Sequence, residues 1–179
     1  MLRTLTRLPR DEAALVVAAR GGDRVAFGLL YRRYARMVHG ILLARVPPGE
    51  VDDLVQDVFL AALRQLGALR DAGAFGPWLA AIARNRARDH YRGAAGFSEL
   101  PSDLAAPAPA TLDVEALALL RWIVRTLPEA YRETVILRLV EGMTGPEIAA
   151  RTGLTPESVR VNLCRGMRKL REQMERTEP

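Results

Sequence analysis

The sequence predicts an all-α protein of two small helical domains joined by a flexible Ala/Pro-rich linker, with a helix-turn-helix in the C-terminal domain. Hydrophobic residues make up 49% of the chain but aromatic residues only 6%, and Ala, Leu and Arg dominate, which favours helices over sheets. Apolar residues recur at helical spacing on either side of an Ala-, Pro-, Ser- and Gly-rich stretch that has no sustained periodicity. We therefore expect domains at residues 10–92 and 114–175 and a linker at residues 93–113.

The charge balance favours an anionic partner. The formal net charge is +5 and the sequence pI is about 10.1, and Lys169 is the only lysine among the basic residues. Arginine makes forked contacts with phosphates and with guanine edges, so this composition suits nucleic acid. A GC-rich genome explains the preference for Arg over Lys equally well.

Several classes of protein are excluded by what the sequence lacks. A single cysteine, Cys164, excludes an internal disulfide and fits a reducing cytoplasm. No apolar run approaches the roughly 20 residues that span a bilayer, so we expect a cytoplasmic protein without membrane insertion. His39 and His90 are too few and too far apart for a metal cluster, and no glycine loop that would cradle phosphate is present. We expect no metal, no cofactor, no small-molecule substrate and no catalytic site.

The first domain is expected to open on two helices. Apolar spacing predicts a short helix over residues 11–20, followed by a glycine pair that ends it. Asp23 is a suitable N-cap for the next helix, on which Phe27, Tyr31 and Tyr34 fall at core positions.

Residues 50–66, EVDDLVQDVFLAALRQL, predict a helix with an acidic outer face. Asp53, Gln56 and Asp57 lie opposite the apolar residues. Like charges four positions apart cost roughly 0.2–0.5 kcal/mol in an isolated helix, and a basic partner surface would relieve that cost. The macrodipole at a helix start explains Asp52 and Asp53 without any partner, but it explains Asp57 poorly.

Residues 75–92, FGPWLAAIARNRARDHYR, predict a basic helix. Arg84, Asn85, Arg88 and Arg92 stand largely outward on its helical projection. An amide among arginines is what recognition of a base edge beside a phosphate requires.

The helix-turn-helix is expected within residues 141–170, EGMTGPEIAARTGLTPESVRVNLCRGMRKL. Thr144 and Glu147 have the spacing of a capping box at the start of its first helix. Gly153 can end that helix in the left-handed region, and Thr155 can cap the second.

The second of these helices has an apolar and a basic side. Its outward side carries Val161, Cys164 and Arg168 and is flanked by Arg160 and Arg165. This pattern is typical of a recognition helix in the major groove of DNA. An ordinary helical hairpin with a solvated basic face remains the alternative from this motif alone.

The motifs together resemble the extracytoplasmic-function (ECF) sigma factors of the sigma-70 family. The resemblance rests on GDRVAFGLLYRRY, VDDLVQDVFLAAL, FGPWLAAIARNRARDHYR and LPEAYRETVILRLVEGMTGPEIAARTGLTPESVRVNLCRGMRKLRE, which occur in the family's order. It implies an alternative sigma factor that binds RNA polymerase core, directs it to specific promoters and assists promoter melting, and that is not an enzyme.

The same resemblance implies three sites. Asp53, Gln56 and Asp57 would face the coiled coil of the largest polymerase subunit. Asn85 would help hold an extruded base of the minus-ten element of promoter DNA, with the arginines around it gripping the strand. The positions matched to the minus-thirty-five element are Arg160, Val161, Asn162, Cys164, Arg165 and Arg168.

Three residues of the recognition helix depart from the family pattern. Val161 and Asn162 stand where the family often has a small polar residue followed by Arg, and Cys164 replaces a commoner His or aromatic residue. Val161 and Cys164 can contact a thymine methyl but cannot make a bidentate base contact. We therefore expect an altered preference in the minus-thirty-five element.

The resemblance also implies an anti-sigma factor as a partner. Two other interpretations are a one-component helix-turn-helix regulator, with residues 1–92 as a sensory or dimerising domain, and an enzyme with an appended DNA-binding domain. The acidic and basic helices of the first domain speak against the regulator, and the enzyme needs a polar catalytic cluster that the sequence does not contain. The inducing signal, the regulon and the relative orientation of the two domains are not predicted.

Overall fold

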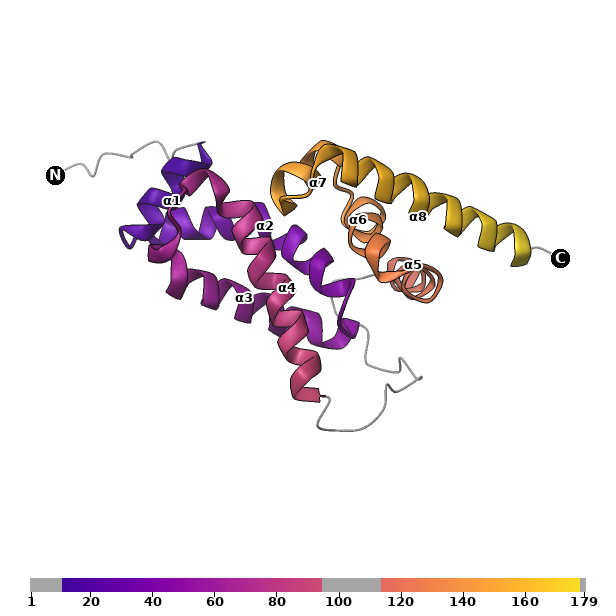
Figure 1. Cartoon of the computed structure of the whole chain (residues 1–179). Helices are drawn as coiled ribbons and strands as arrows, with labels where there is room; N and C mark the ends of the chain where they lie inside the picture. The colour runs from indigo at the N-terminus through magenta and orange to yellow at the C-terminus, as the bar shows by residue number, and fades with distance from the viewer. Residues whose placement is uncertain (1–10, 95–113, 178–179) are drawn as a thin grey trace.

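The computed structural model describes residues 11–94 and 114–177, in which helices are joined by turns and loops and there is no strand, which confirms the all-α prediction (Figure 1). The α-helices are α1 (Glu12–Arg20), α2 (Arg24–Leu43), α3 (Val51–Gln65), α4 (Phe75–Ala94), α5 (Val114–Thr126), α6 (Glu129–Leu139), α7 (Gly145–Thr152) and α8 (Pro156–Thr177). Short 3-10 turns at Pro48–Glu50, Leu66–Ala68 and Ala72–Ala74 join the N-terminal helices. The predicted linker lies outside the described residues, apart from its first two positions.

The first two helices begin and end where the local sequence predicts. After α1, Gly22 adopts a φ of 93°, in the region that glycine enters at little cost. The carboxylate of Asp23 then accepts hydrogen bonds from the backbone N–H groups of Val25 and Ala26, at 2.8 and 3.1 Å. These bonds satisfy donors that a helix start otherwise leaves unpaired.

Helices α2, α3 and α4 enclose the core of the N-terminal domain. The side chains of Leu30, Ile41, Val58 and Phe75 are fully buried there. The predicted core position is wrong for Tyr31, which is 39% exposed and lies on the surface against Phe59, with the ring centroids 4.5 Å apart.

Helices α7 and α8 form the predicted helix-turn-helix. Thr144 and Glu147 make the capping box, and Gly153 ends α7 with a φ of 77°. The hydroxyl of Thr155 accepts a hydrogen bond from the Ser158 N–H at 3.1 Å, which caps α8. A Cβ on Gly166 would lie 2.6 Å from Val135, so glycine is what allows α8 to pack closely on α6.

The two domains pack directly against each other, with α6 in contact with α2 and α7 in contact with α4 (Figure 1). Glycines lie at the points of closest approach. A Cβ on Gly40 of α2 would lie 2.6 Å from Leu137 of α6, and one on Gly153 would lie 3.0 Å from Pro77 of α4. We call this contact between the domains the seam.

Candidate functional site

The acidic side chains of α3 form an open face on the N-terminal domain. Asp53, Gln56 and Asp57 are all exposed, whereas Val55 and Val58 on the opposite side of the helix are buried. Within the described part of the chain neither aspartate has an ion pair. Two uncompensated carboxylates on one helix face provide a surface that a basic partner would stabilise.

Apolar side chains continue this acidic face along α3. Leu60 and Leu63 are 49% and 47% exposed, respectively. The face therefore combines charge with apolar area, as protein interfaces do.

The outward side of α4 carries an amide and two arginines that are open to solvent. Asn85, Arg88 and Arg92 are exposed, as predicted. Arg88 Nη1 lies 3.5 Å from the Asn85 side-chain oxygen, a contact at the long limit of a hydrogen bond. The amide N–H groups of Asn85 remain on an exposed side chain, where they can donate to a base.

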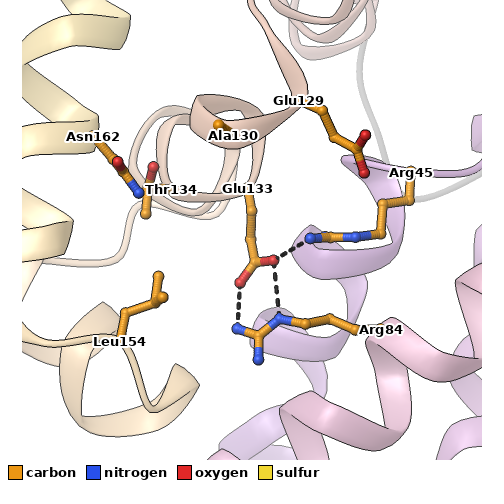
Figure 2. Close-up of a pocket in the computed structure, with 8 residues that line it drawn as sticks. All are labelled: Arg45, Arg84, Glu129, Ala130, Glu133, Thr134, Leu154 and Asn162. Atoms are coloured by element: carbon orange, nitrogen blue, oxygen red, sulfur yellow. Dashed lines mark hydrogen bonds and ion pairs between the residues drawn. The ribbon is translucent and has the colours of Figure 1, made fainter.

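Arg84 has a different environment from its neighbours, and the expectation that it stands outward is wrong. Its Nη2 donates to Glu133 Oε1 at 2.7 Å and its Nε donates to Glu133 Oε2 at 3.2 Å, which makes a forked ion pair with α6 (Figure 2). The same Nη2 donates to the Thr152 carbonyl at 3.2 Å, at the C-terminal end of α7. Arg84 thus lies at the edge of the outward side, where α4 meets the other domain.

Glu133 is the buried centre of this cluster. Its side chain is 8% exposed, and Arg45 Nη2 lies 2.7 Å from its second oxygen (Figure 2). Burial alone would raise the pKa of Glu133, but the hydrogen bond from Arg84 and the charges of Arg45 and Arg84 outweigh it and hold that pKa below its ordinary value. Glu133 is therefore ionised at neutral pH, with two cations from the other domain around it.

Glu141, the residue after the C-cap of α6, provides a second carboxylate that contacts the N-terminal domain. Glu141 is 8% exposed, and its Oε1 lies 2.6 Å from Nδ1 of His39 on α2. Its other oxygen lies 3.8 Å from Nε of Arg36. Glu133 and Glu141 are thus each paired with basic groups of the N-terminal domain.

A third polar contact joins α7 to α2. Arg151 Nη1 donates to the backbone carbonyl of Arg33 at 3.1 Å, and its guanidinium lies 5.8 Å from the ring centroid of Tyr34. The Tyr34 hydroxyl donates to Glu12 of α1. Burial, followed by that hydrogen bond, raises the pKa of Tyr34 well above its ordinary value, so the phenol keeps its proton as a donor.

Helix α8 exposes most, but not all, of the residues that the sequence predicts to face DNA. The exposed residues are Arg160, Cys164, Arg165 and Arg168. Val161 is partly buried. Asn162 is partly buried and lines an open pocket of about 310 Å³ at the seam, facing Thr134 of α6 (Figure 2).

Four charged residues of the seam were not among the sequence-predicted sites: Arg45, Glu133, His39 and Glu141. They belong to no local motif, and their partners in the other domain lie at least 49 positions away along the chain. Helical periodicity would have assigned these charges to solvent.

Two negative findings complete the description. No group of three or more His, Cys, Asp or Glu side chains in the described ranges could hold a metal ion. None of the helices over the described residues has the length and apolar character needed to cross a membrane.

Comparison with known proteins identifies both domains. A family model described as Sigma-70 region 2 matches residues 30–96, and one described as Sigma-70, region 4 matches residues 117–170. The chain is 37% identical over 160 residues to the RNA polymerase sigma factor CarQ of Myxococcus xanthus, covering 86% of this chain and 91% of that protein. It is 33% identical over 174 residues to the RNA polymerase sigma factor NccH of Alcaligenes xylosoxydans xylosoxydans, covering 90% and 94% of the two chains.

A further relative and a solved structure agree with these. The ECF RNA polymerase sigma-E factor of Escherichia coli K12 is 33% identical over 156 residues, which cover 78% of this chain and 81% of that protein. The structure of CnrH in complex with the cytosolic domain of CnrY superposes with a TM-score of 0.66 at 28% identity, covering 93% of this chain and 99% of CnrH.

Proposed function

The chain belongs to the sigma-70 family and is an ECF sigma factor, and from that membership we propose how its surfaces divide the work of promoter recognition. Sigma factors bind RNA polymerase core and promoter DNA, and direct the polymerase to promoters at transcription initiation. They are transcription regulators. The proposal concerns which residues carry each contact.

The acidic face of α3 is the proposed docking surface for polymerase core. Asp53, Gln56 and Asp57 are exposed together, and in the described chain the two carboxylates have no ion pair that docking would have to break. This is the observation that carries the proposal. A basic coiled coil of the largest polymerase subunit would supply the missing positive charge, and the exposed Leu60 and Leu63 would add apolar contact.

The outward side of α4 is the proposed minus-ten site. Arg88, Arg92 and Asn85 are exposed there; the two arginines would contact phosphates of a single strand, and Asn85 would hydrogen-bond a base taken out of the stack. Extruding a base costs a few kcal/mol, which these contacts offset. Arg84 belongs to the same site by the family pattern, but in this arrangement its donors are directed to Glu133 and Thr152.

The exposed side of α8 is the proposed minus-thirty-five site. Arg160, Arg165 and Arg168 supply cations for phosphates or guanine edges, and Val161 and Cys164 lie between them. Asn162 lies beside α6 in the seam, so in this arrangement it is less available to DNA than the other matched residues.

The proposal also includes an anti-sigma factor, a partner protein that keeps this sigma factor inactive. CnrH is seen in complex with the cytosolic domain of CnrY, and the family pattern implies an anti-sigma factor for this chain as well. Such a partner is expected to bind the full chain in the absence of polymerase.

The whole proposal is tested by reconstituted transcription. Purified chain is mixed with sigma-free polymerase core and a library of random promoter fragments, and the transcripts are sequenced. Specific start sites are expected only when chain and core are both present. Sequence-specific DNA binding by the chain alone, with no core-dependent transcription, would instead support an independent regulator.

A further inference from the structure

A pocket of about 370 Å³ lies where α4 meets the start of α6, and arginines dominate its lining. Arg84 and Arg88 come from α4, Arg132 comes from α6, and Arg45 follows the end of α2. Small-molecule sites usually have volumes of about 300–1,000 Å³. The pocket therefore has the volume to hold a small ligand and a lining that favours negative charge.

Positive charge exceeds negative charge in and around this pocket. Glu129 is the one carboxylate among the described residues that line it, and Glu133 adds a second through its contacts with Arg45 and Arg84. Four guanidiniums against two carboxylates leave two positive charges uncompensated. The side chains of Arg45 and Arg84 are only 20% and 26% exposed, so salt screens their charge less than it would at the open surface. An anion with two or more charges would balance the excess.

Three of the four arginines are already held in place by acceptors of the fold. Arg45 Nη1 donates to the Ile41 carbonyl at 3.0 Å, and Arg132 Nε donates to the Leu127 carbonyl at 2.8 Å. Arg84 is held by the forked ion pair described above (Figure 2). Binding to side chains that are already ordered costs less conformational entropy, so this arrangement favours affinity for a ligand.

Several donors of these arginines remain available to a ligand. Within the described residues, Arg132 Nη1 and Nη2 and Arg84 Nη1 have no hydrogen-bond or ion-pair partner. Arg88 is exposed, and the one contact of its guanidinium in that part of the chain is the 3.5 Å approach of Nη1 to Asn85. These donors come from two different helices, so they suit a ligand whose acceptor oxygens point in several directions.

We propose that this pocket binds a small free anion with two adjacent phosphoryl groups, either inorganic pyrophosphate or the diphosphate of a nucleotide. Arg84, Arg88 and Arg132 supply the hydrogen bonds, and Arg45 adds positive charge. Guanidiniums fork onto phosphate oxygens, and a diphosphate offers such oxygens on several sides, so it can contact both helices at once. A single carboxylate carries only half of the charge that the pocket leaves uncompensated. The inference goes beyond the proposed function, because it concerns a ligand of the free chain and needs neither DNA nor polymerase.

The site is tested by isothermal titration calorimetry of the full chain with inorganic pyrophosphate, at constant ionic strength and without divalent metal ions. Saturation at equal amounts of pyrophosphate and chain is expected. Orthophosphate has a single phosphoryl group and should bind at least about tenfold more weakly. ADP distinguishes the two sources of the diphosphate: binding as tight as that of pyrophosphate assigns the site to a nucleotide, and weaker binding assigns it to the inorganic ion.

Two double variants separate the pocket from the general positive charge of the chain. Arg88→Gln, Arg132→Gln removes two lining arginines that have no ion pair in the described chain, and it should weaken pyrophosphate binding by at least about tenfold. Arg171→Gln, Arg176→Gln removes the same charge from the exposed end of α8 and should bind as the wild type does. Circular dichroism checks that both variants fold.

Glu129→Gln supplies a test that leaves every arginine in place. It removes a carboxylate from the lining, so pyrophosphate should bind about threefold more tightly. Glu129 is exposed and has no ion pair within the described residues, so this variant should fold even if the arginine variant does not.

Four results would overturn the proposed anion site. They are no pyrophosphate binding by the wild-type chain, orthophosphate binding as tight as that of pyrophosphate, equal affinity of the two double variants, and unchanged affinity of Glu129→Gln. None of these measurements uses polymerase or a promoter. Failure of the anion site is therefore distinguishable from failure of the proposed function, which shows as absence of core-dependent transcription.

Discussion

His39 and Glu141, 102 positions apart in the chain, meet across the seam with Nδ1 2.6 Å from the carboxylate. The other ring nitrogen of His39, Nε2, is buried and has no hydrogen-bond partner among the described residues. The imidazole is therefore hydrogen-bonded through Nδ1 alone. Substitutions at His39 consequently test how much this single contact between the domains contributes to stability.

Replacing His39 with alanine should destabilise the chain. Glu141 would keep only the longer contact with Arg36, and leaving a buried carboxylate short of donors costs about 1–3 kcal/mol. Urea unfolding followed by circular dichroism measures the loss. His90→Ala is the matched control, because His90 pairs with a half-exposed Glu50 and its loss should cost below about 1 kcal/mol. Equal losses of stability in the two variants would show that the His39–Glu141 pair stabilises the chain no more than an exposed ion pair does.

Gly153→Ala should destabilise the chain by more than Gly142→Ala does. Both glycines have positive φ, 77° and 64°, so each substitution carries a backbone cost of about 1–2 kcal/mol. The new Cβ at position 153 would also meet the Pro77 ring carbon at 3.0 Å, whereas the one at position 142 meets only the flexible end of Arg36. The difference between their free energies of unfolding measures the packing of the turn on α4. Equal free energies of unfolding would mean that the turn at Gly153 does not pack against α4 in solution.

The double variant Asp53→Arg, Asp57→Arg should fold normally and lose affinity for polymerase core by roughly 100-fold, because reversing two interfacial charges removes attraction and adds repulsion. Both side chains are exposed, so the melting temperature should be unchanged. Binding is measured by fluorescence anisotropy against purified core. Glu172→Arg, Glu175→Arg makes the same charge change on the exposed end of α8 and is the control. If the α3 variant bound core with wild-type affinity, α3 would not be part of the docking surface.

Acid should loosen the seam through Glu133. The pKa of Glu133 in the closed chain lies below its ordinary value, so its stabilising contribution is complete above the ordinary glutamate pKa of about 4.3. That contribution is lost as the pH falls through the lowered pKa. Urea unfolding at a series of pH values should show a loss of stability in this acidic window, and Glu133→Gln should lack that component. An identical pH profile in the two proteins would exclude Glu133 as its source.

The upstream promoter element selected by this factor should differ from the one common in the family. Val161 and Cys164 lie among the arginines of α8 and offer apolar contact to a thymine methyl, in place of a polar base contact. Promoter selection with polymerase core measures the preference. Substituting Val161→Ser, Asn162→Arg and Cys164→His should move the minus-thirty-five preference toward the common element, while the minus-ten sequence selected in the same experiment stays unchanged. Selection of the common element by the wild-type chain would contradict the expectation.

The helix ends could be predicted because the interactions that set them are local. Asp23 caps α2 within three residues, Thr144 and Glu147 cap α7 across a single turn, and Gly153 has the conformation that its lack of a side chain predicts. The acidic face of α3 was predicted for a similar reason, since helical periodicity alone separates Asp53 and Asp57 from the core.

The seam could not be predicted, because its contacts join residues that are distant in the sequence. Periodicity distinguishes a buried side from an outer side, but it does not distinguish an outer side that faces water from one that faces a second domain. Arg84 and Asn162 both lie at the edges of their outer sides, and both turn toward the seam. Tyr31 is the reverse case: its spacing predicts a buried core position, but the side chain lies at the edge of the core and is partly exposed.

Arg84 belongs both to the seam and to the proposed minus-ten side of α4, and this has a thermodynamic consequence. Two ligands that compete for one group are linked, and each weakens the other by the same factor. Whatever strand engages Arg84 must therefore lower the affinity of the domains for each other, and any event that parts the domains must raise the affinity for the strand equally. If Arg84 contacts the strand as proposed, a change in the strength of its contact with Glu133 on α6 changes the affinity for DNA without altering any residue that touches a base.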